Sequence, residues 1–120
     1  MFEALEVSLQ LVRALRLPVI RLRRRNRSLS DQIRRAASSL PLNLAEGRRR
    51  SGGDRAHHWR IAAGSAEELR TALRVAIAWG DVEDQEVSDA RAPRSRARHA
   101  LATDPLNAAA SHHEPLSRNR

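Results

Sequence analysis

The stretch that decides the fold is residues 54–80, DRAHHWRIAAGSAEELRTALRVAIAWG. Apolar and small residues recur in it at alternating steps of three and four, which places them on one face of an α-helix. These positions are Trp59, Ala62, Ala66, Leu69, Leu73, Ala76 and Gly80. Ile61, Val75 and Ile77 widen the apolar surface beyond this seam. The segment therefore predicts a long helix that begins at Asp54 and contacts other helices on more than one side.

The N-terminal segment, residues 2–23, predicts a first helix. Its apolar stripe consists of Phe2, Leu5, Leu9, Val12 and Leu15 or Arg16. Pro18 removes one intrahelical hydrogen bond, so we expect the helix to kink there or to end early. Residues 23–27, RRRNR, contain no apolar side chain and predict a basic connection to the next helix.

A second helix is predicted from Ser28 or Ser30, either of which can cap it, to a stop at Gly47. Its apolar stripe consists of Leu29, Ile33, Ala36 or Ala37, Leu40 and Leu44. Because this stripe continues past Pro41, that proline predicts a bend and not a stop. Residues 48–53, RRRSGG, then predict a basic turn.

The pattern weakens after Gly80. Val82, Val87, Ala90 and Ala97 form a sparse stripe with Pro93 in its middle, which predicts a weak or broken fourth helix. Residues 101–120 have the composition of a disordered tail. We therefore expect an all-α protein: an antiparallel up-down four-helix bundle domain over residues 1–100, followed by a disordered C-terminal tail over residues 101–120.

Two segments of the chain resemble a known family. Residues 29–47, LSDQIRRAASSLPLNLAEG, and residues 61–69, IAAGSAEEL, are similar to the two motifs of the 23S-rRNA-intervening-sequence proteins, in the same order and at the same distance. The resemblance implies a left-handed up-down four-helix bundle that associates into a ring-like homopentamer. One relative is the accessory protein of diversity-generating retroelements, in which a basic barrel engages nucleic acid and a reverse transcriptase.

The positive charge is concentrated in the part that predicts helices. All 22 basic side chains are arginine, and the formal net charge is +8. Residues 1–80 hold 16 Arg against seven Asp and Glu, a net +9, whereas residues 81–120 hold six against seven, a net −1. A folded region with this excess can present a fixed basic patch to an anionic partner.

Clusters of arginine are the candidate nucleic-acid-binding residues. They are Arg23, Arg24, Arg25, Arg27, Arg34, Arg35, Arg48, Arg49, Arg50 and Arg55. In an antiparallel bundle the first two connections lie at opposite ends, about 28 Å apart for ~19 helical residues. Arginine arrays suit phosphate contacts, and the clusters lack the aromatic residues that read single-stranded bases. The alternative is a structural or protein-interaction module whose arginines only confer solubility.

Polar residues form a stripe beside the apolar one in the second predicted helix. They are Gln32, Arg35, Ser39, Asn43 and Glu46. We interpret Asn43 and Glu46 as structural residues that bond to neighbouring helices and fix their register. The alternative makes Glu46 a general acid or a metal ligand. His57 and His58 point about 100° apart on a helix and cannot easily share an ion. His112 and His113 belong to the predicted tail.

The remaining expectations concern activity and location. No catalytic residue, cofactor or metal site is predicted, because no nucleophile–base pair, phosphate loop or metal-ligand spacing is present. The chain lacks cysteine and any apolar run of the ~20 residues that span a bilayer, and it begins without a secretory signal pattern. We therefore expect a cytoplasmic, non-enzymatic, basic homo-oligomer that binds RNA or DNA as an accessory protein, and no membrane partner.

Overall fold

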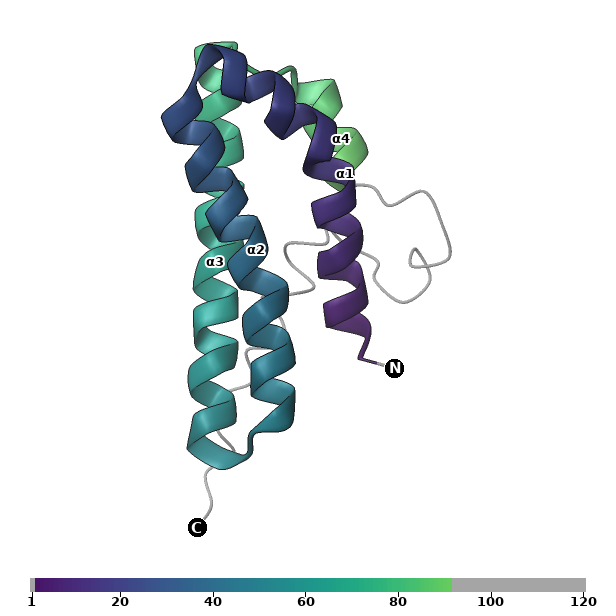
Figure 1. The fold of residues 1–120 in the computed structure, drawn as a ribbon, viewed down its shortest axis with the longest axis vertical. Coiled ribbons are helices and arrows are strands. Elements are labelled where there is room, and N and C mark those ends of the chain that lie inside the picture. The colour runs from purple at the N-terminus through teal and green to yellow at the C-terminus, as the bar shows by residue number, and fades with distance from the viewer. Residues whose placement is uncertain (1, 92–120) are drawn as a thin grey trace.

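The computed structural model describes residues 2–91, which form four helices. These are α1 (Glu3–Arg25), α2 (Arg27–Arg49), α3 (Gly52–Trp79) and α4 (Asp84–Arg91). The helices α2 and α3 form a long antiparallel hairpin, α1 runs antiparallel to α2, and the short α4 packs against α1 (Figure 1). The predicted all-α class is confirmed. The expectations about Pro93 and the tail at 101–120 lie outside the described residues.

The core lies where α2 contacts α1 and α3. The stripe predicted for α2 is confirmed, since Leu29, Ile33, Ala36, Ala37, Leu40 and Leu44 are all buried. The seam predicted for α3 faces it and buries Ala62, Ala66, Leu69, Leu73 and Ala76. Trp59 is only partly buried at the start of the seam, and Gly80 ends α3 in the left-handed conformation with φ 78°. Both helices present one continuous apolar face, so their periodicity identified the core.

The stripe predicted for α1 is correct at Leu15 and otherwise wrong by about one position. The buried residues are Ala4, Val7, Ser8, Leu11, Leu15, Pro18 and Leu22. Leu5, Leu9 and Val12, which the spacing placed in the core, are half-buried instead. This helix carries apolar residues on two adjacent faces, and a period of 3.6 residues fits either face equally well. One of the two faces therefore stays partly exposed.

The junction between α1 and α2 is shorter than predicted. The helix α1 continues through Pro18 to Arg25 and bends in its second half (Figure 1), and Asn26 alone separates it from α2. Arginine is a good helix former, so the charge cluster does not end the helix. The Asn26 side chain accepts a hydrogen bond from the Leu29 N–H at 3.1 Å and caps α2 in place of the serines proposed above. The hydroxyl of buried Ser30 instead donates to the Val19 carbonyl at 3.0 Å.

The predicted stop at Gly47 is also wrong, because α2 continues to Arg49. Gly47 is buried, and a Cβ at this position would overlap the Trp59 ring. The glycine therefore permits close packing of α3 on α2 and does not act as a terminator. The helix passes through Pro41 as expected, and α3 begins at Gly52, two residues before Asp54.

Gly64 in the middle of α3 gives a prediction about stability. It is exposed, and a Cβ added there would meet no atom within 4 Å. Gly64→Ala should raise the free energy of unfolding by about 0.5–1 kcal/mol, because alanine loses less backbone entropy in a helix. Urea unfolding measures the change, with Ala63→Gly as the matched control that should lower stability. A loss of stability in Gly64→Ala would contradict the open space that surrounds this position within the single chain.

Candidate nucleic-acid interface

The ten predicted arginines fall at three places. Arg23, Arg24, Arg25 and Arg27 surround the α1–α2 turn, and Arg34 and Arg35 follow in the first half of α2. Arg48, Arg49, Arg50 and Arg55 surround the α2–α3 turn. The two turns lie at opposite ends of the hairpin, as the antiparallel arrangement predicted (Figure 1).

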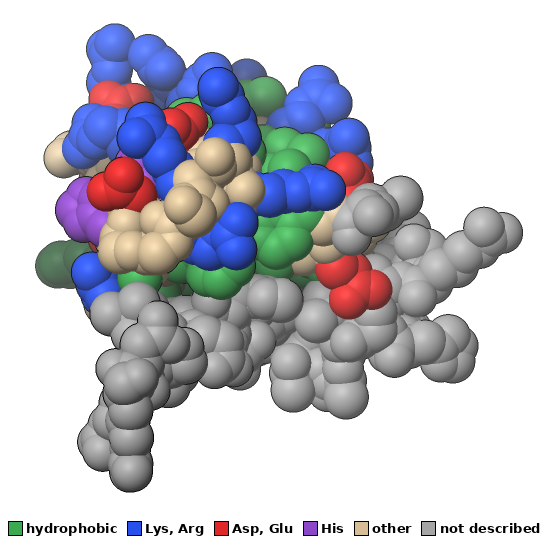
Figure 2. Space-filling model, turned by 90° about the horizontal axis from the view of Figure 1, so that it is seen from below, with side chains coloured by type: hydrophobic (Ala, Val, Ile, Leu, Met, Phe, Trp, Pro, Cys, Tyr) green, Lys and Arg blue, Asp and Glu red, His purple; other side chains and the backbone are tan. Residues whose placement is uncertain are grey.

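At the α2–α3 end, arginines pair with acidic side chains. The Arg50 guanidinium donates to the Glu46 carboxylate at 2.9 Å and lies 3.9 Å from that of Asp54. Arg49 lies 4.0 Å from Glu46. Figure 2 shows the molecule from this end, where basic and acidic side chains lie next to one another. A nucleic-acid phosphate would therefore have to compete with the carboxylates of Glu46 and Asp54 for these arginines.

Arg55 at the same end binds the backbone. Its half-buried side chain donates to the carbonyl groups of Gly47, Arg48 and Arg50 at 3.0 to 3.3 Å. These are carbonyls of the α2 C-terminus, where the last turn lacks intrahelical donors. Its guanidinium also lies 5.5 Å from the centre of the Trp59 ring. The contacts give Arg55 a capping role, which competes with the predicted phosphate contact.

Arg48 takes part in a small aromatic cluster. Its guanidinium lies 5.5 Å from the centre of the Phe2 ring, which in turn stacks on Trp59 with the ring centres 6.1 Å apart. This cluster ties the start of α1 to the α2–α3 end. Sequence reasoning missed it, because Phe2 and Trp59 are far apart in the chain.

Most of the arginines near the α1–α2 turn have guanidinium groups that contact no other described side chain or carbonyl group. Among them, only Arg25 has a partner in the described part of the chain, the Gly80 carbonyl at 3.2 Å. The guanidinium groups of the other five form no ion pair, hydrogen bond or ring contact within residues 2–91. These five exposed residues are Arg23, Arg24, Arg27, Arg34 and Arg35. This half of the molecule therefore presents guanidinium groups that are free to bind an anion.

Asn43 links α2 to α3, as predicted. Its Oδ1 lies 3.1 Å from Nδ1 of His58, and its amide group donates to the Ser39 carbonyl and hydroxyl at 2.9 and 3.1 Å. The Ser65 hydroxyl donates to that of Ser39 at 2.8 Å. A polar network thus crosses the packed face between the two helices. The sequence did not identify His58 and Ser65 as its members.

The structural role predicted for Glu46 is wrong in its partners. Glu46 bonds to Arg50, at the end of its own helix, and not to a neighbouring helix, because it lies in the last turns of α2 beside the arginines that follow. His58 is occupied by Asn43, and His57 is exposed. Within residues 2–91 no group of three or more His, Cys, Asp or Glu side chains could hold a metal ion.

The Glu46–Arg50 pair gives a prediction about pH. The hydrogen bond from Arg50 lowers the pKa of Glu46 below its ordinary value. A carboxylate with a lowered folded-state pKa stabilises the fold above its ordinary pKa, and this contribution is lost as pH falls through the folded pKa. Glu46→Gln should therefore have a lower Tm than the parent at pH 7, and the difference should vanish at strongly acidic pH. A difference in Tm between the two proteins that stays constant from pH 7 to strongly acidic pH would contradict this role of the Glu46–Arg50 pair.

The fold and its surface define the class of the molecule: a basic, all-α protein built on an antiparallel helical hairpin, with arginine clusters at both ends of α2. No helix among residues 2–91 is long and apolar enough to cross a membrane. The family model for the 23S rRNA-intervening sequence protein matches residues 3–101, and the chain belongs to this family. No curated protein and no solved structure matches the chain.

Proposed function

We propose that the protein is a non-enzymatic accessory that binds RNA or DNA through the exposed arginines of the α1–α2 half. The observation that carries this proposal is the contrast between the two ends of α2. Arginines at the α2–α3 end contact carboxylates, carbonyls and rings, whereas Arg23, Arg24, Arg27, Arg34 and Arg35 have no such partner within residues 2–91. A free guanidinium can pair with phosphate without first breaking an internal contact.

The chemistry of the five arginines favours contact with the backbone of the nucleic acid. Residues 23–35 contain no aromatic side chain, and at the same end of the molecule Trp79 is 75% exposed next to Gly80, which accepts from Arg25. Stacking on a single ring is tolerant of base identity. Binding should therefore depend strongly on salt and weakly on base sequence, as expected where phosphate contacts dominate. An accessory that holds a nucleic acid for another protein needs no more than this.

We further propose that the protein is a homo-oligomer, for which the family resemblance suggests a homopentamer. The outward face of α3 supports this, because Ile61, Val75 and Trp79 are 38%, 39% and 75% exposed. Several copies would repeat the arginine cluster, and linked binding sites raise the overall affinity for a long polyanion. A cytoplasmic location stays a prediction from the sequence.

One experiment tests both proposals with the full chain. Light scattering gives the mass of the assembly, which we expect to be several times the 13.5 kDa of one chain. A mass of one chain would contradict the homo-oligomer. Titration with duplex DNA and RNA at about 50 and 200 mM salt gives the affinities, and about five phosphate contacts predict a 10²- to 10³-fold loss for duplex DNA over this range. The alternative, an interaction module with no nucleic-acid role, predicts a well-folded protein that binds neither polymer at low salt.

A further inference from the structure

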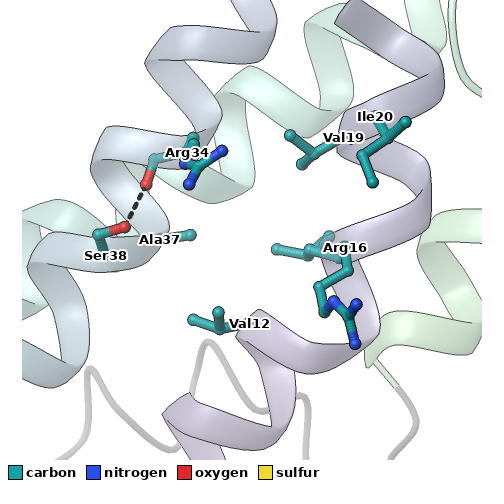
Figure 3. Close-up of a pocket in the computed structure, with 8 residues that line it drawn as sticks. Val12, Arg16, Val19, Ile20, Arg34, Ala37 and Ser38 are labelled. Carbon is teal, nitrogen blue, oxygen red and sulfur yellow. Dashed lines mark hydrogen bonds between the residues drawn. The ribbon is translucent and has the colours of Figure 1, made fainter.

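A groove between α1 and α2 adjoins the proposed nucleic-acid interface and shares Arg34 with it. The groove has a volume of about 270 Å³. Its lining residues are Val12, Leu15, Arg16, Val19, Ile20, Arg34, Ala37 and Ser38. Figure 3 shows Val12 and Val19 of α1 directed toward Ala37 of α2, with Arg16 and Arg34 on opposite walls. The groove therefore combines an aliphatic floor with a guanidinium on each side.

The α1 wall of this groove includes Val12, from the apolar stripe that the sequence placed in the core, and Val19 and Ile20 further along the helix. Val12 and Val19 are only half-buried, and Ile20 is 54% exposed. The stripe flanks the buried face of α1, so α2 covers it only in part. An apolar helix face of this kind is commonly completed by another helix.

The groove extends along α2. Arg34 and Ser38 also line a shallower depression that reaches from Asp31 to Asn43 and includes exposed Leu42. The twelve helical steps from Asp31 to Asn43 span about 18 Å, enough to lie beside about three turns of a partner helix. Arg16, Arg34 and Arg35 outnumber Asp31 along it, so its charge suits a negative occupant.

The helix α4 shows how α1 binds an acidic helix. It carries Asp84 and Glu86 in its first turn and buries Val87. The Glu86 carboxylate pairs with the Arg21 guanidinium at 3.2 Å. By helical periodicity Arg21 lies on one flank of the buried stripe of α1 and Arg16 on the other. The groove therefore has the same combination of apolar side chains and arginine as the α4 binding surface, but on the opposite flank of α1, which α4 does not contact.

From this geometry we infer that the groove binds an acidic amphipathic helix of a partner protein. Aliphatic side chains at helical spacing fill the floor between Val12 and Ala37, and carboxylates of the same helix pair with Arg16 and Arg34. The floor lacks an aromatic ring on which a base could stack, so nucleic acid suits it less well. This inference does not rest on the proposed nucleic-acid function, because Arg16 and Ile20 lie outside that interface.

The test uses the full chain and a fluorescent helical peptide with leucine at every third and fourth position and glutamate elsewhere. Saturable binding by anisotropy is expected, and replacing the glutamates with lysine or the leucines with serine should weaken it about tenfold or more. Arg16→Glu and Ile20→Ser should each weaken it about tenfold. The control variants Arg74→Glu on α3 and Leu17→Ser, at an exposed α1 position outside the groove, should not. Circular dichroism checks that every variant keeps its helical content.

Several results would overturn the inference. These are no saturable binding of the glutamate peptide, equal binding of the lysine peptide, or equal losses in the control variants. Duplex DNA affinity should be unchanged in Ile20→Ser, so a loss there would assign the groove to nucleic acid. A fall in assembly mass in the same variant would assign it to a second copy of the chain. Absence of DNA binding by the parent would contradict the proposed function alone.

Discussion

Replacing Arg23, Arg24 and Arg27 together with glutamine is expected to weaken duplex DNA binding about 10²-fold or more near 0.1 M salt. Each of these arginines is exposed and unpaired within residues 2–91, so each can neutralise one phosphate. The neutralised phosphate releases about 0.9 counterion, which is the main source of affinity in phosphate-dominated binding. Competition titration against a labelled duplex measures the loss.

The control for this variant removes the same charge elsewhere. Arg13, Arg60 and Arg74 are also exposed, and they lie outside the α1–α2 turn. Their triple replacement with glutamine lowers the net charge by the same three units and should reduce affinity much less. Equal losses in the two triple variants would show that net charge, and not the cluster, determines binding. All six arginines are exposed, so the helical content should be unchanged.

Gly47→Ala is expected to destabilise the fold by about 1–3 kcal/mol. Alanine is favoured over glycine by about 1 kcal/mol inside a helix, so propensity alone predicts the opposite sign. The new methyl group would overlap the Trp59 ring and approach the Cβ of His58 within 3.3 Å, which forces α3 away from α2. Urea unfolding measures the change against Gly64→Ala, which is the same substitution at an open position.

A second substitution separates steric overlap from other causes. Trp59→Leu replaces the ring with a smaller side chain, so Gly47→Ala should cost much less in that background. The double-mutant cycle should give a coupling energy of about 0.5–3 kcal/mol, as for residues in direct contact. Gly47→Ala with stability equal to or above that of the parent would contradict the close approach of the two helices.

The buried faces of α2 and α3 could be predicted because each helix has one dominant apolar face. The stripes from Leu29 to Leu44 and from Ala62 to Ala76 are regular over several turns, so the choice of the buried face was unambiguous. The buried face of α1 was predicted wrongly because its apolar residues cover two adjacent faces, and the choice between them depends on how this bent helix lies against α2. Only tertiary packing decides that choice.

The places of the ten arginines on the fold could be predicted from the sequence, but the internal contacts of their guanidinium groups could not. Sequence clusters located all ten arginines, yet they could not show which guanidinium groups are occupied. Arg55 reaches carbonyls at the end of α2 only because the chain reverses between Arg49 and Gly52. Asn26 was missed as a cap because the surrounding arginines predicted a loop, although arginine extends a helix well. Contacts across a turn depend on its geometry, which residue types alone do not determine.

The most direct measurement compares the salt dependence of duplex DNA binding for two triple variants. One replaces Arg23, Arg24 and Arg27 with glutamine, and the other replaces Arg48, Arg49 and Arg50. If the α1–α2 end contacts the phosphates, the slope of log affinity against log salt should become shallower by about 2.7 in the first variant, because each contact contributes about 0.9. It should change by less than about 1 in the second. Equal changes in both slopes, or a larger change in the second, would contradict the assignment of the interface to the α1–α2 end.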